Sequence, residues 1–557
     1  MVKRLFQFLH KETAGLHEAA YLLAFFAVLS QVLAFIRDRL LAHIFGASTT
    51  LDIYYAAFRI PDFIFVTVAS VVSISVLVPF IVEKEHQNRE AVKEFISAIF
   101  SFFAILIIFA SVVAFFLVPY ISSVLFRGFS PEALKEVIFV SRIMLLSPIA
   151  LGFSNLFGSL TQAYSRFTIY AMAPLLYNVG IILGIILLGT KLGATGVAVG
   201  VVLGACLHAL VQVPFLLKED LLPKRLHLNF APIKRVASLS LPRTLTLSTS
   251  QIAIIFLVSL ATLMTAGSVS VLSFSINLQS VPLTIIGVSY SLAAFPTLSR
   301  YFAEKNITAY VQEMVATVRH IFFWALPMTA LFVVLRAQVV RVLLGTGNFD
   351  WNATRLTAAA MALFVISSVF QCLLLLFMRA FYSAGHTKKP FVANLISMVI
   401  LVFVTYGLVQ TFYVSDGFRY FITALLRVGD IPGTAVLMLP LGYSIGTIIN
   451  GLIHWTMFEI DFRGFSRQVT RAVFESFGAA VIMGVATYIG LVVFALFFNT
   501  GTLVGIFLQG FLAGILGILV GIAVLHALGS KELKEVWVAI RTRFWKAKVI
   551  ATDPEIV

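Results

Sequence analysis

Residues 30–62 read SQVLAFIRDRLLAHIFGASTTLDIYYAAFRIPD, and they combine two apolar runs with an unusual number of charges. The charged side chains are Arg37, Asp38, Arg39, Asp52, Arg59 and Asp62. A charge in the middle of a bilayer costs about 2.5–3.5 kcal/mol even on the lenient insertion scale, so such residues usually face a protein interior or a wet cavity. We therefore predict a polar cavity wall at the outer end of a first membrane helix and along a second.

These charges fall into two groups. Arg39 and Asp62 are interpreted as interfacial anchors at helix ends, with side chains that extend to the lipid headgroups. Arg37 and Asp38 are assigned to the cavity. Because adjacent residues lie about 100° apart on a helix, we expect these two side chains to share one polar face without pairing directly.

The composition is that of a polytopic membrane protein. Of the 557 residues, 60% are hydrophobic and only 12% are charged, and the mean hydropathy is +1.00. No soluble domain of this size has such a composition. The net charge of +15 does not indicate a nucleic-acid partner, because the basic residues fall in short connections between apolar runs. Cys206 and Cys372 both lie inside predicted spans, so neither a disulfide framework nor a metal site is expected.

Apolar runs of about 20 residues predict an all-α fold with fourteen membrane-spanning helices. The predicted spans are 19–44, 51–82, 94–119, 133–161, 168–190, 194–217, 239–264, 270–299, 312–335, 356–382, 390–414, 433–458, 472–498 and 503–527. Residues 1–18 form a predicted interfacial amphipathic segment, and residues 531–557 form a predicted cytoplasmic amphipathic tail.

The positions of lysine and arginine predict the orientation. With the N-terminus inside, most of the 40 basic residues lie in the inner connections, at the inner ends of the helices or in the tail. The outer side holds only Arg127, Lys191, Arg336, Arg341, Arg355, Arg419 and Arg427. By the positive-inside rule, both termini are expected in the cytoplasm, with the chain in the cytoplasmic membrane.

The sequence contains an internal repeat. Residues 163–178 read AYSRFTIYAMAPLLYN and residues 381–394 read FYSAGHTKKPFVAN, each with Tyr-Ser, a basic turn and Pro-x-x-x-Asn. The matched positions here and at Pro79/Pro296 and Phe129/Phe349 differ by 216 to 220 residues. We predict two parallel six-helix lobes, residues 19–230 and 231–460, a common transporter plan with the substrate site between the lobes. Residues 461–530 would add two helices outside the repeat.

The two predicted lobes differ in charge. Charged residues inside spans concentrate in the first lobe, where Arg142 joins the stretch quoted above. The first two spans of the second lobe are polar but largely neutral, and helical spacing places Ser273 and Asn277 on one face. Two roles are open for these side chains, hydrogen bonding between helices and lining of the same cavity.

No sequence motif indicates an enzyme. The chain has no H-E-x-x-H, no phosphate-binding loop, no nucleophile elbow and no cluster of cysteine or histidine. We therefore expect a protein that is not an enzyme and binds no cofactor. Transport would be driven by an ion gradient, by the membrane potential or by consumption of the substrate.

Residues 30–79 resemble the MurJ/MviN lipid II flippase family, a branch of the multidrug/oligosaccharidyl-lipid/polysaccharide exporter superfamily. The matching pieces are FIRDRLLAHIFGAS, LDIYYAAFRIPDF and VLVPF, with further blocks at 141–178, 267–300 and 379–390. The resemblance implies a V-shaped, two-lobed bundle with a central cationic cavity. It also implies alternating-access transfer of undecaprenyl-diphosphate-linked peptidoglycan precursor to the outer leaflet, with residues 461–530 forming a groove for the lipid tail.

The resemblance also implies which residues bind the substrate. Arg37 and Asp38 match the Arg-Asp pair of span 1, Asp52 matches the acidic residue of span 2, and Arg59 matches the basic residue before Ile-Pro. An arginine fork is suited to diphosphate oxygens. Gln31 and Asn277 stand where the family usually has arginines. The candidate substrate-binding residues are Gln31, Arg37, Asp38, Asp52, Arg59, Asn178, Ser273 and Asn277.

Other functions remain open at this point. A flippase or exporter of another polyprenyl-linked glycan fits the missing arginines. A cation-coupled exporter of small molecules would use Asp38 or Asp52 for protonation, and a non-transporting scaffold for cell-wall synthesis would need neither. The expected partners are the lipid-linked precursor, membrane lipids and cell-wall synthesis proteins, and the chain is expected to be a monomer.

Overall fold

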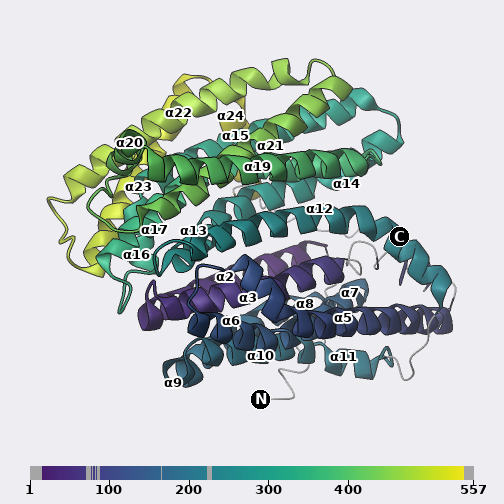
Figure 1. The fold of residues 1–557 in the computed structure, drawn as a ribbon. Helices are drawn as coiled ribbons and strands as arrows, with labels where there is room; N and C mark the ends of the chain where they lie inside the picture. The colour runs from purple at the N-terminus through teal and green to yellow at the C-terminus, as the bar shows by residue number, and fades with distance from the viewer. Residues whose placement is uncertain are drawn as a thin grey trace. The chain divides into compact units, whose positions relative to one another are not determined.

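The computed structural model describes residues 16–70, 77, 80–81, 83–84, 88–164, 166–222 and 229–544, and the regular structure in these ranges is entirely helical. Figure 1 shows the helices in chain order. The first half contains α2 (Leu16–Phe45), α3 (Thr49–Ala69), α5 (Arg89–Leu125), α6 (Pro131–Met144), α7 (Leu146–Ala163), α8 (Phe167–Gly184), η2 (Ile185–Gly189), α9 (Thr190–Leu192), α10 (Ala194–Leu210) and α11 (Val213–Lys218).

The remaining helices continue the same pattern of long apolar segments. They are α12 (Phe230–Thr262), α13 (Ser268–Pro282), η3 (Leu283–Val288), α14 (Ser289–Ala303), α15 (Ile307–Val334), α16 (Arg336–Leu343), α17 (Trp351–Val365), α18 (Ser368–Ser383), α19 (Lys388–Val414), α20 (Asp416–Leu426), η4 (Thr434–Leu437), α21 (Met438–Asp461), α22 (Phe465–Phe494), α23 (Leu503–Ala527) and α24 (Lys531–Phe544).

The helices account well for the predicted spans. Eleven segments of the described chain are long and apolar enough to cross a membrane, and α17 with α18, bent by 42°, forms a twelfth candidate. Together with α2 and α3, which contain the charged stretch, these segments are consistent with the fourteen predicted spans. The all-helical membrane fold is confirmed.

Element boundaries differ from the predictions at several places. The predicted second span, 51–82, begins as α3, which ends at Ala69, and much of 71–82 lies outside the described residues. The short helices α16 and α20 were not predicted. The predicted segment 1–18 also lies mainly outside the described range, and α2 begins within it at Leu16. The predicted tail begins as a helix, α24, at Lys531.

The chain divides into two compact units, which we treat separately. Unit 1 comprises Met1–Leu278, Leu343–Met361 and Thr387–Gly446, and unit 2 comprises Gln279–Val342, Ala362–His386 and Thr447–Val557. The helices of the second repeat are thus shared between the units. The two compact units therefore differ from the predicted lobes 19–230 and 231–460, which follow the sequence repeat. The boundaries of those lobes stay a prediction.

Two pairs of helices begin with the same kind of N-cap hydrogen bond at the spacing of the sequence repeat. Asn88 caps α5 and Asn306 caps α15, each by accepting a hydrogen bond from the backbone N–H three residues later. These asparagines are 218 positions apart. Ser130 caps α6 and Asp350 caps α17 in the same way, 220 positions apart. Cap residues are chosen by local backbone chemistry, so their recurrence marks equivalent helix starts.

The turn that drew attention to the repeat also recurs. After α7, the N–H of Arg166 donates to the carbonyl of Thr161 at 2.7 Å, and after α18, the N–H of His386 donates to the carbonyl of Phe381 at 2.8 Å. Both helices therefore end with a hydrogen bond across five residues, 220 positions apart. Such bonds satisfy carbonyls left free at a helix end. The two turns therefore have the same backbone geometry, as the predicted repeat implies.

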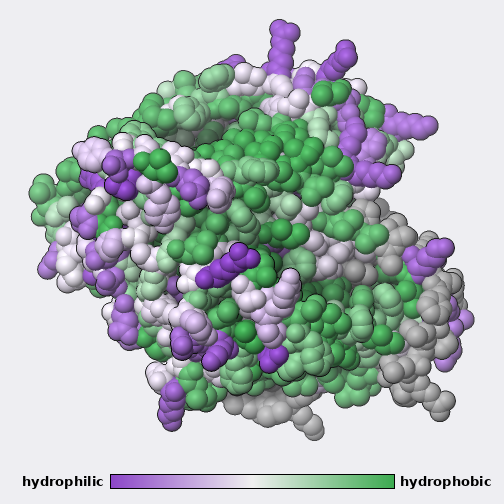
Figure 2. Space-filling model, in the orientation of Figure 1, coloured by the Kyte–Doolittle hydropathy of each residue, from purple (hydrophilic) through white to green (hydrophobic). Residues whose placement is uncertain are grey.

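Each unit has its own apolar core, and much apolar surface remains outside it. Phe103, Ile107 and Phe157 are buried in unit 1, and Phe377 and Phe458 are buried in unit 2. Broad hydrophobic areas remain on the face shown in Figure 2. Soluble monomers rarely expose apolar patches of this extent, whereas a bilayer covers them.

Helices α8 and α10 of unit 1 approach each other backbone to backbone. A Cβ added at Gly180 would come 2.3 Å from the Cα of Gly204, and one added at Gly184 would come 2.3 Å from the Cα of Gly200. Small residues permit such close packing of membrane helices. The contact fixes α8, the helix that presents Asn178 to the site described below.

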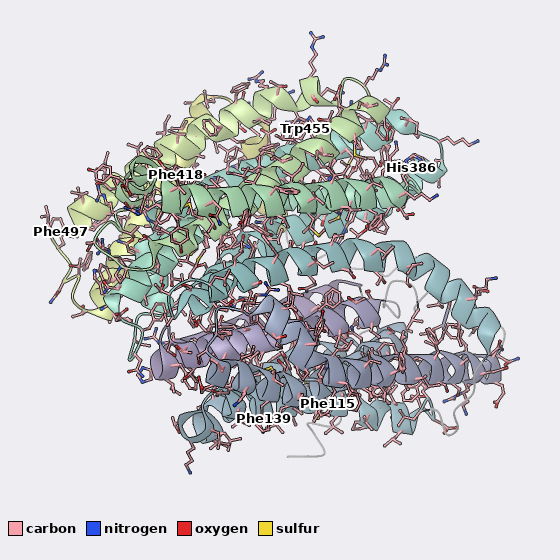
Figure 3. The ribbon with its side chains drawn as sticks, viewed as in Figure 1. Phe115, Phe139, His386, Phe418, Trp455 and Phe497 are labelled. Atoms are coloured by element: carbon pink, nitrogen blue, oxygen red, sulfur yellow. The ribbon has the colours of Figure 1, made fainter. Side chains whose placement is uncertain are left out.

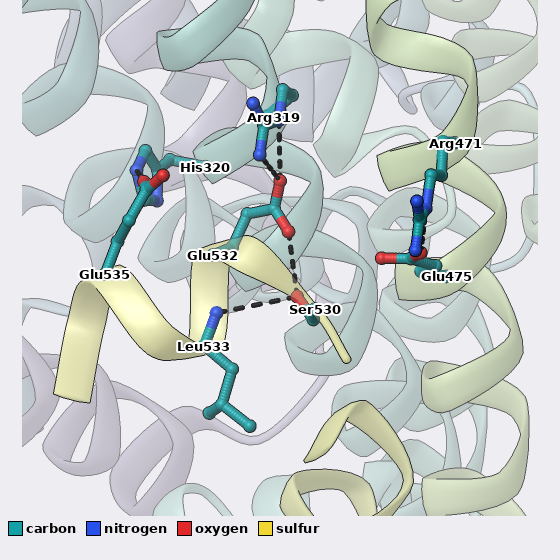
Figure 4. Close-up of polar contacts among 8 residues, drawn as sticks. All are labelled: Arg319, His320, Arg471, Glu475, Ser530, Glu532, Leu533 and Glu535. Carbon is teal, nitrogen blue, oxygen red and sulfur yellow. Dashed lines mark hydrogen bonds and ion pairs between the residues drawn. The ribbon is translucent and has the colours of Figure 1, made fainter. Parts of the chain in front are cut away.

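The tail helix α24 is anchored in unit 2 by polar contacts (Figure 4). Arg319 of α15 donates to the Glu532 carboxylate from Nε at 2.6 Å, and Ser530 donates to the other carboxylate oxygen at 2.8 Å. His320 Nε2 lies 2.9 Å from Glu535 Oε2. Leu533 packs against Phe323 and Leu525. The helix therefore has a docked face, while Trp537 stays 65% exposed.

Candidate functional site

Arg37 and Asp38 form a direct ion pair. The Asp38 Oδ1 atom accepts from Arg37 Nε at 2.9 Å and from the terminal nitrogen Nη2 at 2.8 Å. The expectation that these neighbours share a face without pairing is therefore wrong. The arginine side chain is long enough to curve across the 100° that separates adjacent residues on a helix. Leaving the carboxylate unpaired would be costly, because the Asp38 side chain is only 7% exposed.

Asn178 of α8 is the second partner of Arg37. Its Oδ1 accepts from Arg37 Nη1 at 3.1 Å, and its Nδ2 donates to the carbonyl of Pro174 at 3.1 Å. The same Nδ2 lies 3.4 Å from Ser30 Oγ. The amide orientation follows from this network, since a carbonyl must accept and a guanidinium must donate. Asn178 therefore holds the guanidinium in place.

Asn277 of α13 binds the other oxygen of Asp38. Asn277 Nδ2 donates to Asp38 Oδ2 at 3.0 Å, across 239 positions of sequence. The carboxylate thus receives an arginine on one oxygen and a neutral amide on the other. The structure brings together Arg37, Asp38, Asn178 and Asn277, and their role in binding substrate stays a prediction.

Asp52 caps the N-terminus of α13. Its Oδ2 accepts from the Gly267 N–H at 2.7 Å, and its Oδ1 accepts from the Ser270 N–H and Oγ at 2.7 and 2.6 Å. These are backbone groups without partners inside the helix, and a negative charge is favoured there. Both oxygens of Asp52 are therefore occupied by protein donors. Its inclusion among the substrate-binding residues stays a prediction.

Arg59 lies further along α3 and faces the same helix, α13. Its Nη2 donates to Ser273 Oγ at 3.2 Å, and its buried Nε has no hydrogen-bond partner in the described structure. One turn further on, Asp62 accepts a hydrogen bond from the Gln251 side chain on α12. Asp62 was interpreted as an interfacial anchor, but it faces a neighbouring helix instead.

Gln31 is the eighth candidate, and it is half-buried on α2. It precedes Asp38 by seven residues, which is close to two helical turns, so the two share a face. Its role stays a prediction.

Near Asp52, turns that are distant in the sequence of unit 1 contact each other in a way that the sequence did not reveal. Asn348 donates from its backbone N–H to the carbonyl of His43 at 3.0 Å and from its side chain to the carbonyl of Ile44 at 2.6 Å. His43 Nδ1 lies 3.1 Å from Thr346 Oγ1. Gly267 has φ +88°, and a Cβ there would come 2.5 Å from the carbonyl oxygen of Ala47. In the sequence, the glycines of these turns are the feature that could have indicated these contacts.

The network consists of charges and neutral hydrogen-bonding groups, without a metal-binding cluster. In the described part of the chain, no group of three or more histidine, cysteine, aspartate or glutamate side chains could hold a metal ion. The arrangement can neutralise, orient and release an anionic group. Buried charges at the junction of two repeats in a helical membrane protein are characteristic of a membrane transporter.

Comparison with known proteins supplies the family. The family model described as "Lipid II flippase MurJ" matches residues 41–509, which is most of the chain. The protein therefore belongs to the lipid II flippase MurJ family. A relative from Burkholderia cenocepacia named "Lipid II flippase MurJ" is 24% identical over 494 residues, which covers 84% of this chain and 95% of the relative.

Solved structures agree on the fold. A structure titled "Lipid II flippase MurJ, inward closed conformation" has a TM-score of 0.70 at 20% identity, covering 93% of this chain and all of the other. An inward-facing multidrug resistance MATE family transporter of the MOP superfamily has a TM-score of 0.64 at 16% identity, covering 78% and 96% of the two chains. The resemblance inferred from the charged stretch is confirmed.

Proposed function

We propose that this protein is a flippase that moves lipid II, the undecaprenyl-diphosphate-linked peptidoglycan precursor, across the cytoplasmic membrane by alternating access. The observation that carries the proposal is membership of the MurJ family over residues 41–509. Both termini lie in the cytoplasm, as the distribution of basic residues indicates. The protein works as a monomer and as a transporter without its own catalytic chemistry.

Arg37 is the substrate-binding cation in this proposal. Its three hydrogen bonds to Asp38 and Asn178 occupy three of the five guanidinium N–H donors. Two donors are left for phosphate oxygens, and the side chain keeps 21% exposure. Asp38 and Asn178 orient the guanidinium and reduce the ordering that binding requires.

The remaining candidate residues support this cation. Asn277 and Ser273 hold the carboxylate of Asp38 and the guanidinium of Arg59, and Asp52 fixes the start of α13. Gln31 shares the face of Asp38. These groups keep the charged residues of the first repeat in a defined geometry while the phosphate enters and leaves.

Complementation of a flippase-depleted bacterium tests the function. Wild-type protein is expected to restore growth, and translocation of fluorescent lipid II in proteoliposomes supplies the direct measurement. Arg37→Ala is expected to lose both activities at an unchanged membrane level, and Arg37→Lys to retain part of them, because an ammonium keeps the charge but loses the fork. Arg419→Ala is the matched control, since that arginine lies on α20 and pairs with Asp416.

Different failures have different meanings. Full activity of Arg37→Ala would remove Arg37 from the site but leave the flippase function standing. Wild-type protein that inserts but does not complement would contradict lipid II as the substrate. Transfer of another polyprenyl-diphosphate glycan in the same vesicles would then identify a different cargo, and altered drug resistance alone would identify a small-molecule exporter.

A further inference from the structure

Arg142 lies on the outward face of α6. Helical spacing places it in one stripe with Lys135, Phe139 and Leu146, and the two apolar members are each 56% exposed. Helices α6 and α7 together form a candidate membrane span of 33 residues, so this stripe faces lipid. A cation in such a position is costly and marks a functional site by default.

Arg142 has one clear structural task. Its Nε donates to the backbone carbonyl of Phe115 on α5 at 3.2 Å. That carbonyl would normally accept the N–H of residue 119, but Pro119 lies there inside the helix and has no N–H. The guanidinium also lies 4.5 Å from the centroid of the Phe115 ring. Arg142 therefore satisfies a carbonyl that the proline leaves free.

This task does not explain why the residue is an arginine. It uses one of the five guanidinium N–H donors, and a neutral donor could perform it. Within the described residues, Arg142 forms no ion pair, and its only polar contact is with Phe115. A positive charge and four N–H donors are left at a lipid-facing position.

The guanidinium of Arg142 can extend toward the charged N-terminal end of α6. The charged residue nearest to it toward the N-terminus of α6 is Glu136, six residues earlier, which corresponds to about 9 Å of helix. Helical side chains lean toward the N-terminus of their helix, which here is the end that carries Glu132 and Glu136. A long arginine stem can snorkel over most of that distance.

We propose that Arg142 binds the phosphate of an anionic membrane phospholipid in the seam between α5 and α6. The charge is complementary, and a guanidinium fork can donate to two phosphate oxygens at once. Phe115 and Phe139, 41% and 56% exposed, flank the position and offer apolar surface to the glycerol and the first part of the acyl chains. Figure 3 labels both residues, Phe115 on α5 and Phe139 on α6.

The proposal concerns a bound bilayer lipid and does not depend on the transported substrate. Native mass spectrometry of the full-length protein, titrated with phosphatidylglycerol in detergent, measures it directly. Arg142→Leu is expected to weaken the tightest phosphatidylglycerol site roughly fivefold, the effect of one basic residue at a membrane surface. Arg419→Leu, on α20, is the matched control and should leave that site unchanged.

A second variant separates lipid binding from the structural task. Pro119→Ala restores the N–H that the Phe115 carbonyl lacks, so Arg142 is no longer needed to satisfy it. We expect Pro119→Ala to bind the lipid as the wild type does and Pro119→Ala/Arg142→Leu to bind it about fivefold more weakly, with both variants folded. Wild-type affinity of the double variant for phosphatidylglycerol would overturn the proposal. Equal loss in titrations with phosphatidylcholine would also overturn it, because the contact would then not depend on lipid charge.

Discussion

The first two helices of each repeat, α2–α3 and α12–α13, occupy equivalent positions but carry different chemistry. The first pair contains buried charges, whereas the facing side chains of the second pair are neutral. The two sets bind each other across more than 180 positions of sequence. The pairs are Asp38 with Asn277, Asp52 with Ser270, Arg59 with Ser273, and Asp62 with Gln251.

This difference indicates how a charged site can separate and reform. A buried ion pair is costly to break because each partner is left as an uncompensated charge. A hydrogen bond from a neutral group contributes much less, about 0.5–3 kcal/mol. The ion pair of the site, Arg37 with Asp38, lies within one helix and never has to separate. The contacts between repeats use neutral partners instead. Separating the repeats therefore costs less free energy, and the charged side chains stay together on the first repeat.

Moving the carboxylate to the other repeat should have the largest effect. We expect Asp38→Asn to destabilise the protein by about 3 kcal/mol, because Arg37 loses its ion-pair partner in a largely buried place. Asp38→Asn/Asn277→Asp should recover most of that stability. The ion pair would then join the two repeats, and an opening step made harder by about 1.4 kcal/mol would slow translocation about tenfold.

Thermal unfolding in detergent and lipid II translocation measure the two effects. Asn277→Asp alone is the control, and it should be destabilised because it places two carboxylates together. A double variant with wild-type stability and wild-type translocation would show that the neutrality of the second repeat has no function.

Removing the cap of α13 should have the next largest effect. Asp52→Ala should lower stability by about 2 kcal/mol, since two backbone N–H groups and the Ser270 hydroxyl lose a charged acceptor. Ser48→Ala, which removes the weaker cap of α3 with its 3.5 Å contact, should cost less than about 1 kcal/mol. Equal decreases in melting temperature for Asp52→Ala and Ser48→Ala would show that the cap that joins the two repeats stabilises the protein no more than an ordinary helix cap.

A smaller effect is expected at Ser273. Ser273→Ala removes the one hydroxyl that accepts from Arg59, so we expect a loss of about 1 kcal/mol. Ser299→Ala is the control, because that hydroxyl bonds a carbonyl of its own helix, that of Phe295. Urea titration of both variants measures the difference, and a larger loss at Ser299 would count against the contact between repeats.

The smallest effect is expected at the tail helix α24. Its ion pair, between Glu532 and Arg319 of α15, joins elements that need not separate. Burial raises the pKa of Glu532, but hydrogen bonds from its own backbone N–H, Ser530 and Arg319 outweigh it, so the pKa lies below the ordinary 4.5. The stabilisation is therefore fully present above pH 4.5 and is lost as the pH falls through the lowered pKa. Trp537 fluorescence should report release of α24 at acidic pH only.

Glu532→Gln is the control for that titration. It should lower the stability of α24 docking by about 0.5 kcal/mol at neutral pH and remove the acid-dependent change. An unchanged acid transition in this variant would assign the transition to another group.

The predictable part of this protein is the part that local sequence controls. Length and apolarity identified the helices because a bilayer demands about 20 apolar residues in each span. The matching turns at 163–178 and 381–394 revealed the repeat. The short helix α20 was missed because its 11 residues are too few to give a membrane signal. The site residues were recognised as costly charges, but their roles were not.

The sequence by itself determined that this chain is a repeated helical membrane protein with charges inside the spans concentrated in the first repeat, since apolarity, charge and spacing are properties of each segment alone. Tertiary structure decided what each charge does. Asp52 became a helix cap and Asp62 the partner of Gln251, because those outcomes depend on which distant backbone and side-chain groups the packing of helices brings into hydrogen-bonding distance. Hydrogen bonds act only between groups that are close in space, and a linear sequence does not give the distances between groups on different helices.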